Sequence, residues 1–500
     1  MLPNLIAKPG IDDYLLTVCN RLKPSGEVNV DAPVQANQES GGVSAEADWT
    51  LSGAVVTSIT SWRYWNWSPR SDLFQTPLDD FSRSQVIDRQ KQFTQELRIA
   101  STGDNTVDYI AGLYYFRETV DAYALTRYGT AAVATVLSPA LPALILNGVG
   151  VEAVNAYKTD SYAAFGQATW HLTDNLNLTG GLRYTSDRKK GSYVGVASGG
   201  LPLAGPLVAF APLRSAFASS GSFNVKSNEG AWGGHLDLAY DINDDVMTYV
   251  SYSRGNRSGG LNLVQLPPGA SAIVAPETVD AYEVGLKTRL FDRRLTLNAA
   301  AFIETDKDYQ AQTVDPVLLR PYLANIKEVS SKGIEVSAQL RPSQYVSAYG
   351  SATYNEAAYE DFKTSPCPVE QPLPAPAFCD ISGISLPGVP RWAAAFGFEV
   401  HRPVTMGAGQ AELYFGLDDA YRSTVNSAAT ASRYSTLPSR NLVNARLGLR
   451  EADSRWDAYI WSKNLGDVDY KNSDGALPAG YLIAFKGDPR TYGITLRMRR

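Results

Sequence analysis

Apolar and polar residues alternate along most of the chain, and the stretch 162–184 shows this pattern clearly. Its first half places apolar or small residues at every second position: Tyr162, Ala164, Gly166, Ala168 and Trp170. After a short turn at 172–174, the same spacing returns with Leu176, Leu178, Gly180, Leu182 and Tyr184. A period of two is typical of a β-strand with one apolar face, so this stretch predicts a β-hairpin.

The polar face of this hairpin indicates where the two faces point. It carries Asn177 and Arg183, and burying either side chain in a dry core without a partner would cost several kcal/mol. A water-filled lumen leaves both side chains solvated, so the apolar face must be the outer one. The same pattern recurs at 282–303 and 334–354. The chain is therefore predicted to be all-β, a transmembrane antiparallel β-barrel.

Short turns within hairpins alternate with long loops between them. The predicted turns are 51–53, 102–105, 172–174, 242–244, 291–293, 342–344, 402–409 and 452–454. The predicted loops are 67–89, 118–158, 186–228, 257–277, 307–329, 359–387, 422–440 and 467–489. Outer-membrane barrels keep short turns on the periplasmic side and long loops outside, and their last strand, here about 490–500, runs inward.

Strict alternation gives about 17 strands, with the first near residues 43–50. Residues 1–42 are then an external loop remnant, and residues 43–500 form the barrel domain. Bacterial single-chain barrels have even strand counts, so an odd count predicts that an upstream strand is missing. The chain also opens without a charged segment followed by an apolar one, so Met1 does not begin a signal peptide.

Two apolar stretches, 131–156 and 200–219, are predicted as external loops. Prolines interrupt both stretches, which argues against a membrane-spanning helix in the first. The remaining composition fits a barrel: 44% of residues are hydrophobic, 11% are aromatic, and Tyr is the commonest aromatic with 28 copies. A Tyr-rich soluble sandwich is the competing interpretation. The net charge of −6 argues against nucleic acid as a partner.

Several segments resemble the barrel of TonB-dependent outer-membrane receptors, in order and at the expected spacing. They are QFTQELRIAS at 92–101, DYIAGLYYF at 108–116, YVSYSRGNRSGGLN at 249–262, PETVDAYEVGLK at 276–287, SSKGIEVSAQLRP at 330–342, WSKNLGDVDY at 461–470 and GDPRTYGITLRM at 487–498. The resemblance implies a barrel of about 22 strands around a plug domain, with a TonB-contacting box near the N-terminus. This sequence shows no plug, no box and about five strands fewer. Arg500 stands where the family places a terminal aromatic residue.

The resemblance further implies an outer-membrane receptor that binds a nutrient in its external loops and imports it when TonB pulls the plug. Iron–siderophore, glycan and other nutrients stay open as ligands. Outer-membrane lipid is an expected partner, and TonB is one only through the absent plug. Ligand contacts are expected from the lumen rim and the loops, and the candidate residues are Arg254, Asn256, Arg257 and Tyr309.

No residue pattern indicates catalysis, a cofactor or a metal site. The histidines His171, His235 and His401 lack ligand spacing, and neither GxSxG nor a P-loop is present, so the chain is not predicted to be an enzyme. Cys367 and Cys379 flank a Pro-rich segment of one external loop and are predicted to form a disulfide in an oxidising compartment. Cys19 has no partner in view.

Two other function classes compete with the receptor. A passive porin of about 16 to 18 strands needs no plug, but it does not account for the receptor-like segments. A soluble β-rich binding protein or hydrolase conflicts with the outward apolar faces and with the lack of catalytic motifs.

Overall fold

The computed structural model describes most of the chain from Val34 to Met498. The described ranges are 34–71, 78–137, 139–267, 269–315, 321–368, 370–371, 376, 378–406, 409–430, 432–451, 455–476 and 482–498. Cys19, Arg500, the predicted turn at 452–454 and most of the predicted loop 1–42 lie outside these ranges.

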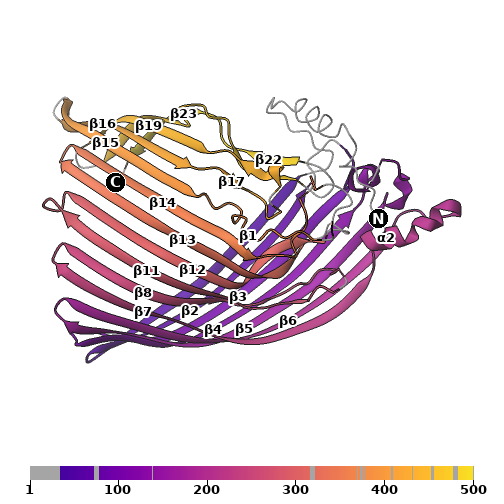
Figure 1. Cartoon of the computed structure of the whole chain (residues 1–500), viewed down its shortest axis with the longest axis horizontal. Helices are drawn as coiled ribbons and strands as arrows, with labels where there is room; N and C mark the ends of the chain where they lie inside the picture. Colours follow the sequence, from indigo (N-terminus) through magenta and orange to yellow (C-terminus); the bar gives the residue numbers. More distant parts are fainter. Residues whose placement is uncertain are drawn as a thin grey trace.

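One antiparallel sheet of 17 strands forms the body of the protein, as the alternation predicted. In spatial order its strands are β1 (Gln35–Leu51), β2 (Ala54–Ser71), β3 (Arg83–Ser101), β4 (Val107–Arg127), β5 (Val149–Thr173), β6 (Leu176–Gly199), β7 (Gly221–Asn243), β8 (Val246–Arg257), β11 (Glu277–Leu290), β12 (Leu295–Val314), β13 (Pro321–Ser343), β14 (Val346–Asp361), β15 (Trp392–Met406), β16 (Gly409–Arg422), β19 (Arg440–Glu451), β20 (Trp456–Lys463) and β23 (Thr491–Met498). Each strand pairs with its neighbours in the chain. The sheet is strongly curved, with short turns at one end and loops at the other (Figure 1).

Short two-stranded ribbons lie in three of the loops between sheet strands. They pair β9 (Gly260–Leu261) with β10 (Ile273–Val274), β17 (Val425–Asn426) with β18 (Thr436–Leu437), and β21 (Lys471–Ala476) with β22 (Leu482–Lys486).

Most of the described turns fall within about two residues of their predicted places, but β15 runs to Met406 through most of the turn predicted at 402–409. The strands also reach further into the predicted loops. The loop predicted at 118–158 contains the end of β4 and the start of β5, and the loop at 186–228 shrinks to 200–220. β1 begins at Gln35, so the expected loop 1–42 and strand start at 43 are wrong over residues 35–42. A barrel strand needs only about 9–11 residues to cross the membrane, whereas β5 has 25. Ladder hydrogen bonds also form in water, so pairing continues outside the lipid.

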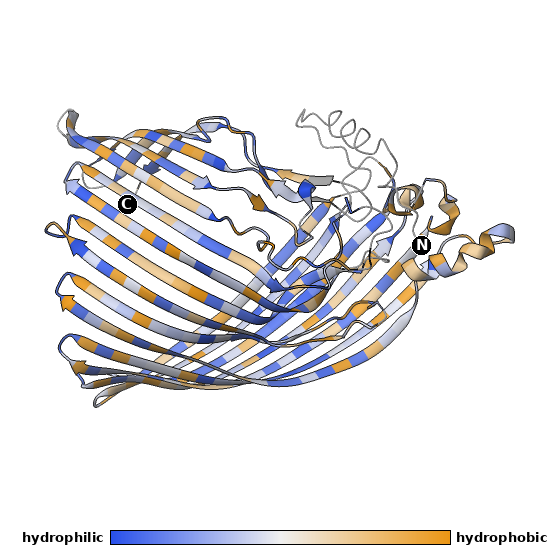
Figure 2. Cartoon of the chain, in the orientation of Figure 1, coloured by the Kyte–Doolittle hydropathy of each residue, from blue (hydrophilic) through white to orange (hydrophobic). Residues whose placement is uncertain are grey.

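Hydropathy alternates along the sheet strands, as the banding in Figure 2 shows. On the outer face, aromatic rings of neighbouring strands meet in pairs whose centroids lie 4.8–5.1 Å apart. We call this set the outer girdle: Tyr115, Tyr162, Tyr184, Trp232, Tyr252, Tyr282, Tyr354 and Trp392. Aromatic residues favour the membrane interface, so the girdle marks the outer boundary of the hydrocarbon.

The loops beyond the girdle contain an apolar core of their own. It joins the 128–148 loop, with the short helical segments η1 (Val133–Leu137) and η2 (Ala143–Ile145), to η3 (Gly205–Phe210) and α2 (Ala211–Phe217). Its fully buried residues are Ala132, Val133, Ile145 and Leu146. Arg214 of α2 donates hydrogen bonds to the carbonyls of Ile145 and Leu201, both at 2.8 Å. Among the described helices, none is long and apolar enough to cross a membrane.

The two edge strands of the sheet are β1 and β23, and no pairing joins them within the described residues. Both run toward the turn end, so direct pairing between them would be parallel. Tyr492 and Ile494 of β23 are 81% and 82% exposed, compared with 54% for Ile460 on the adjoining strand β20. The free edge therefore uncovers apolar side chains as well as backbone groups.

We expect a membrane-impermeant thiol reagent to label single cysteines at Asn147 and Asn472 in intact cells, but not at Asp292. Asn147 lies in the loop between β4 and β5, and Asp292 lies in the turn between β11 and β12 at the opposite end. Mass spectrometry of the labelled protein gives the measurement, and permeabilised cells give the control for reactivity at Asp292. Labelling of Asp292 in intact cells would reverse the orientation.

Candidate functional site

The loop end of β8 carries three of the residues predicted to contact ligand, but on different faces. Arg254 and Asn256 follow Tyr252 of the outer girdle at two-residue spacing, so they share its outward face. The Arg254 guanidinium lies 3.3 Å from the Asp280 carboxylate of β11 on that face. Arg254 and Asn256 therefore face away from the lumen, and their contact with ligand stays a prediction.

Arg257 and Tyr309 lie on the lumen side of the rim. The Arg257 guanidinium is 4.0 Å from the Glu277 carboxylate, and its side chain is 64% exposed. Tyr309 of β12 packs against a small apolar cluster made of Ile326, Val329, Tyr359, Phe362 and Ile381. Arg257 is thus a cation open to the lumen, whereas Tyr309 supports the loop that follows β14.

A buried lysine ties the start of the 258–276 segment to the barrel wall. Lys189 of β6 is 3% exposed, and its ammonium donates hydrogen bonds to the Glu229 carboxylate, the Ser258 hydroxyl and the Gly259 carbonyl. A Cβ at position 259 would clash with the backbone carbonyl oxygen of Val274 and would lie 2.6 Å from a Glu229 oxygen, so only glycine fits this approach. The ion pair and its hydrogen bonds together offset the desolvation of the buried ammonium.

Side-chain amides hold the rest of this segment against β12 and β13. The Gln310 amide donates to the carbonyls of Ser258 and Ala275, both at 3.0 Å. Asn262, 4% exposed, donates to the Leu323 carbonyl and accepts from the Leu323 amide, each at 2.9 Å. These side-chain amides form hydrogen bonds with backbone groups that have no strand partner in the sheet. The segment is therefore a fixed part of the rim.

Two carboxyl groups meet beneath this segment. Burial raises the pKa of Asp306, and the adjacent Glu277 carboxyl raises it further, from the ordinary 3.8 to about 7. The positive charge of Arg257 acts in the opposite direction and lowers this pKa. Glu304 acts in the same direction as Glu277. Asp306 pairs with Val279, three positions beyond the Tyr282–Ile303 pair at the girdle, so it lies outside the membrane-spanning part. The rim therefore holds an acid that titrates near neutral pH.

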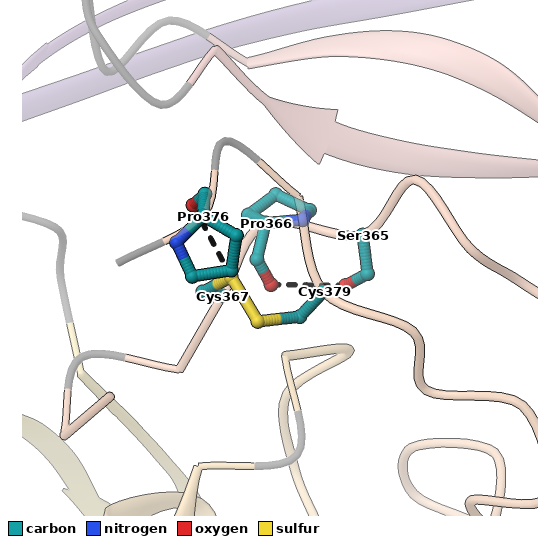
Figure 3. Close-up of a disulfide and its surroundings, with 5 residues drawn as sticks. All are labelled: Ser365, Pro366, Cys367, Pro376 and Cys379. Atoms are coloured by element: carbon teal, nitrogen blue, oxygen red, sulfur yellow. Dashed lines mark hydrogen bonds between the residues drawn. A yellow bond between two sulfur atoms is a disulfide. The ribbon is translucent and has the colours of Figure 1, made fainter. Parts of the chain in front are cut away.

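A disulfide closes the loop between β14 and β15. It joins Cys367 to Cys379, whose Cα atoms are 4.9 Å apart (Figure 3). The Cys379 amide donates to the Ser365 carbonyl at 2.8 Å, and Ile381, two residues later, is buried against Tyr359 and Phe362. The bridge thus fixes a loop whose apolar residues already pack on the lumen side of the rim.

Charged side chains on the lumen face of β15, β16 and β19 pair with one another along the wall. The Arg450 guanidinium contacts the carboxylates of Glu399 and Glu412, both at 2.8 Å. Arg446 reaches Glu399 at 3.2 Å and Asp418 at 3.1 Å. These charges lie opposite an apolar outer face, as a water-filled lumen requires. Within the described chain, no group of three or more His, Cys, Asp or Glu residues could hold a metal ion.

Comparison with known families decides between the classes left open by the sequence. Residues 10–465 match the model of the TonB dependent receptor-like β-barrel. The chain belongs to this family. Its members are transport receptors of the Gram-negative outer membrane and are not enzymes, which favours the receptor over the passive porin.

Curated relatives match part of this receptor barrel. The pesticin receptor of Yersinia pestis is 30% identical over 304 residues, which are 58% of this chain and 38% of that protein. The catecholate siderophore receptor Fiu of Escherichia coli K12 is 23% identical over 446 residues, 87% of this chain and 53% of that one. The chain thus spans about half or less of the length of these relatives.

Solved structures share the fold of the receptor barrel over nearly its whole length. The ferric yersiniabactin uptake receptor FyuA of Yersinia pestis superposes with a TM-score of 0.70 at 20% identity, covering 93% of this chain and 62% of that one. The ferric-catecholate import receptor Fiu of E. coli K12, in its closed form, gives 0.65 at 17% identity, covering 96% and 67%.

Sequence reasoning missed the residues that organise the rim of the receptor. Lys189, Glu229 and Gln310 lie on β6, β7 and β12, and Ser258 begins the segment that they hold. Lys189 fell inside the predicted loop 186–228, where a charge is normally solvated, and Glu229 directly follows that loop. An available signal was the alternation itself, because Lys189 and Asp187 continue the lumen-facing spacing of Arg183 and Thr185.

We expect Asp306→Asn to stabilise the receptor increasingly as pH rises. The raised pKa means that the folded protein favours the neutral form of the Asp306 carboxyl. The contribution of this carboxyl to the free energy of unfolding is complete below about pH 4 and is lost as pH rises through about 7. Asparagine is neutral throughout, so the gain should be absent near pH 4 and on the order of 1 kcal/mol near pH 8. Thermal unfolding of the detergent-purified receptor across this range gives the measurement. Asp308→Asn, at an exposed neighbouring position, is the control. A gain that does not vary with pH would contradict the assignment.

Replacing both Cys367 and Cys379 by serine should speed cleavage of the 362–391 loop by external protease while leaving the barrel heat-modifiable. Closing a loop of this size is worth roughly 2–3 kcal/mol, so loop opening becomes about 30- to 150-fold more frequent. Non-reducing peptide mapping of the wild-type receptor should recover the two cysteines joined. Recovery of two free thiols from an oxidising compartment would contradict the pairing.

Proposed function

We propose that this chain forms the wall and external loops of a receptor that imports an iron–siderophore complex, energised by TonB through a plug domain outside residues 34–498. The observation that carries the proposal is the similarity to receptors whose names give siderophores as ligands, over 87% of the chain in sequence and 93% in structure. A ferric complex of this kind is too large for simple diffusion through a narrow pore, which suits a gated barrel.

The rim supplies the contacts in this proposal. Ferric siderophores are commonly anionic, and Arg257 offers a guanidinium that is 64% exposed on the lumen side. Tyr309 holds the loop closed by the disulfide, so it acts on the ligand through that loop. Arg254 and Asn256 face outward and are assigned to first contact with ligand outside the barrel.

Uptake of radiolabelled iron tests the proposal in the bacterium that carries the natural gene. Under iron limitation, deletion of the gene should abolish uptake of its cognate ferric siderophore, and plasmid-borne wild type should restore uptake only in cells with functional TonB. Undiminished uptake without TonB would indicate a passive pore instead. Unchanged uptake of every ferric siderophore tried after deletion would contradict the siderophore assignment.

The Arg257→Gln variant should weaken the apparent affinity of uptake by about tenfold, because it removes one charge-assisted contact. Arg293→Gln is the matched control: its side chain is 65% exposed, almost the same as that of Arg257, but it lies in the turn at the periplasmic end. Equal effects of the two substitutions would show that the rim position has no special role.

A further inference from the structure

Four lysines form one row across neighbouring strands, on the loop side of the outer girdle. Lys91 of β3 pairs with Thr119 of β4, and Thr119 pairs with Lys158 of β5. Lys158 pairs with Lys190 of β6, which in turn pairs with Lys226 of β7. We call Lys91, Lys158, Lys190 and Lys226 the lysine row. The strands β3 to β7 are consecutive neighbours in the sheet, so the row follows one continuous stretch of the wall (Figure 1).

The lysine row faces away from the lumen. On β5, Lys158 lies four positions from Tyr162 of the outer girdle, and residues at even spacing share one face of a strand. On β6, Lys189 is buried on the lumen side, so the next residue, Lys190, points outward, where it is exposed. Directly paired residues point to the same face, which places the other lysines outward as well. The wall therefore separates the row from everything inside the barrel, including a plug domain.

The row lies at the height of lipid headgroups. Thr119 and Lys158 are four positions beyond Tyr115 and Tyr162, the ring pair of the outer girdle on these strands. Four positions correspond to about 13 Å along a strand, and to about 10 Å along the membrane normal at a strand tilt of roughly 40°. The girdle marks the edge of the hydrocarbon, so the ammonium groups lie beside the headgroups of the outer leaflet.

Like charges meet directly in this row. Residues opposed on antiparallel strands have Cβ atoms about 5 Å apart, and like charges in such pairs destabilise a sheet. Lys158 is opposed to Lys190, and Lys226 is opposed to Lys190 on its other side. An anion placed between two of these ammonium groups attracts both, which removes the repulsion. The register of the strands therefore favours a bound anion at Lys190.

A carboxylate balances part of the positive charge on the girdle side of the row. Asp160 lies 3.1 Å from the Lys158 ammonium and 3.5 Å from the Arg117 guanidinium. Arg188 is opposed to Asp160 on β6, and its guanidinium lies over the Tyr162 ring, 5.8 Å from the centroid. One carboxylate thus stands among three cations, and this part of the outer face keeps a positive charge.

The other end of the row has less compensation. On the loop side, Asp121 is opposed to Arg89, so these two charges balance each other. Within the described residues, neither Lys190 nor Lys226 forms an ion pair with a carboxylate. The positive charge of the outer face is therefore concentrated on β6 and β7, beside the paired Lys158.

We propose that the lysine row binds the phosphate groups of an outer-leaflet lipid whose headgroup carries more than one phosphate. Phosphate oxygens accept charge-assisted hydrogen bonds from ammonium groups, and a second phosphate reaches a second pair of lysines. Below the girdle, the apolar outer face offers Leu113 and Leu182, 61% and 57% exposed, to the acyl chains of the same lipid. A soluble phosphate has no such apolar contact, which favours the lipid as the source of the anion.

This proposal is independent of siderophore uptake, because the row lies on the opposite face of the wall from the lumen. It also goes beyond lipid as the general surroundings of a barrel. It assigns one headgroup chemistry, several phosphates, to named residues on β3 to β7.

Native mass spectrometry tests the proposal on the receptor produced from its natural gene, purified in detergent and freed of bound lipid by detergent exchange. The probes are diphosphoryl lipid A, monophosphoryl lipid A and phosphatidylethanolamine, each titrated to give an apparent Kd. Diphosphoryl lipid A should bind saturably and at least about fivefold more tightly than monophosphoryl lipid A, because one lysine contact near an anionic headgroup is worth about this factor. Phosphatidylethanolamine should bind more weakly than either, and inorganic phosphate in tenfold excess should displace none of them.

Neutral substitutions in the row should weaken binding of diphosphoryl lipid A. Lys158→Gln combined with Lys190→Gln should weaken it about 25-fold, and Lys226→Gln alone should weaken it about fivefold. Heat modifiability identifies the variants that keep the barrel, and Lys226→Gln carries the test if the double variant does not fold.

Lys307→Gln is the matched control. Lys307 of β12 is exposed and lies four positions beyond Ile303, which is opposed to Tyr282 of the outer girdle, so it has the same face and height as the row. Its opposed residues are Thr278 and Glu328, not lysines. This substitution should leave binding of diphosphoryl lipid A unchanged.

Three results would overturn the assignment: equal affinity for the two forms of lipid A, unchanged affinity in folded row variants, or an equal loss in the Lys307→Gln control. Displacement by inorganic phosphate would also reject the lipid and would indicate a site for a soluble anion. The assay contains no siderophore, so its outcome does not depend on the proposed function.

Discussion

Every backbone amide and carbonyl that enters the hydrocarbon must find a partner within the protein, because lipid offers none and each unpaired group costs several kcal/mol. Between β1 and β23 the protein meets this constraint with a single ladder that runs without interruption, and within the described residues only the outer sides of these two edge strands stay unpaired. The two-residue alternation follows from it. Once the backbone is committed to the ladder, each side chain faces either lipid or lumen, and the pairing of Arg450 with Glu399 and Glu412 is possible only on the wet face.

Beyond the outer girdle the same ladder has a different role. There both faces of the strands are in water, and side chains on the strands hold the adjoining loops in place. Lys189 and Gln310 lie in this part of the wall and hold the 258–276 segment by hydrogen bonds to Ser258. Asn262 joins the same segment to β13 by a hydrogen bond. The apolar loop core around Ile145 and the loop closed by Cys367 and Cys379 are anchored at the same end. The extended strands thus form a rigid base on which external loops adopt fixed conformations.

This arrangement separates recognition from the wall that crosses the membrane. Ion pairs on the lumen face of β15, β16 and β19 are satisfied within the wall. By contrast, Arg257 at the rim is largely exposed. Polar groups left open at the mouth of a barrel are the ones available to a ligand.

The sequence by itself determined the local features of this protein. Alternation around Tyr162 and Leu182 predicted strands with an apolar outer face, and the turns and about 17 strands followed, because a period of two and a turn are both set by near neighbours in the chain. Tertiary structure alone decided how far each strand runs and which side chains meet. Asp187 and Lys189 lie in a stretch that reads as a polar loop, and only pairing with β5 and β7 makes that stretch a strand. Arg254 and Arg257 are three residues apart, yet strand geometry places them on opposite faces. Lys158, Lys190 and Lys226 form one row because the register of three strands aligns them, and register depends on contacts between residues far apart in sequence.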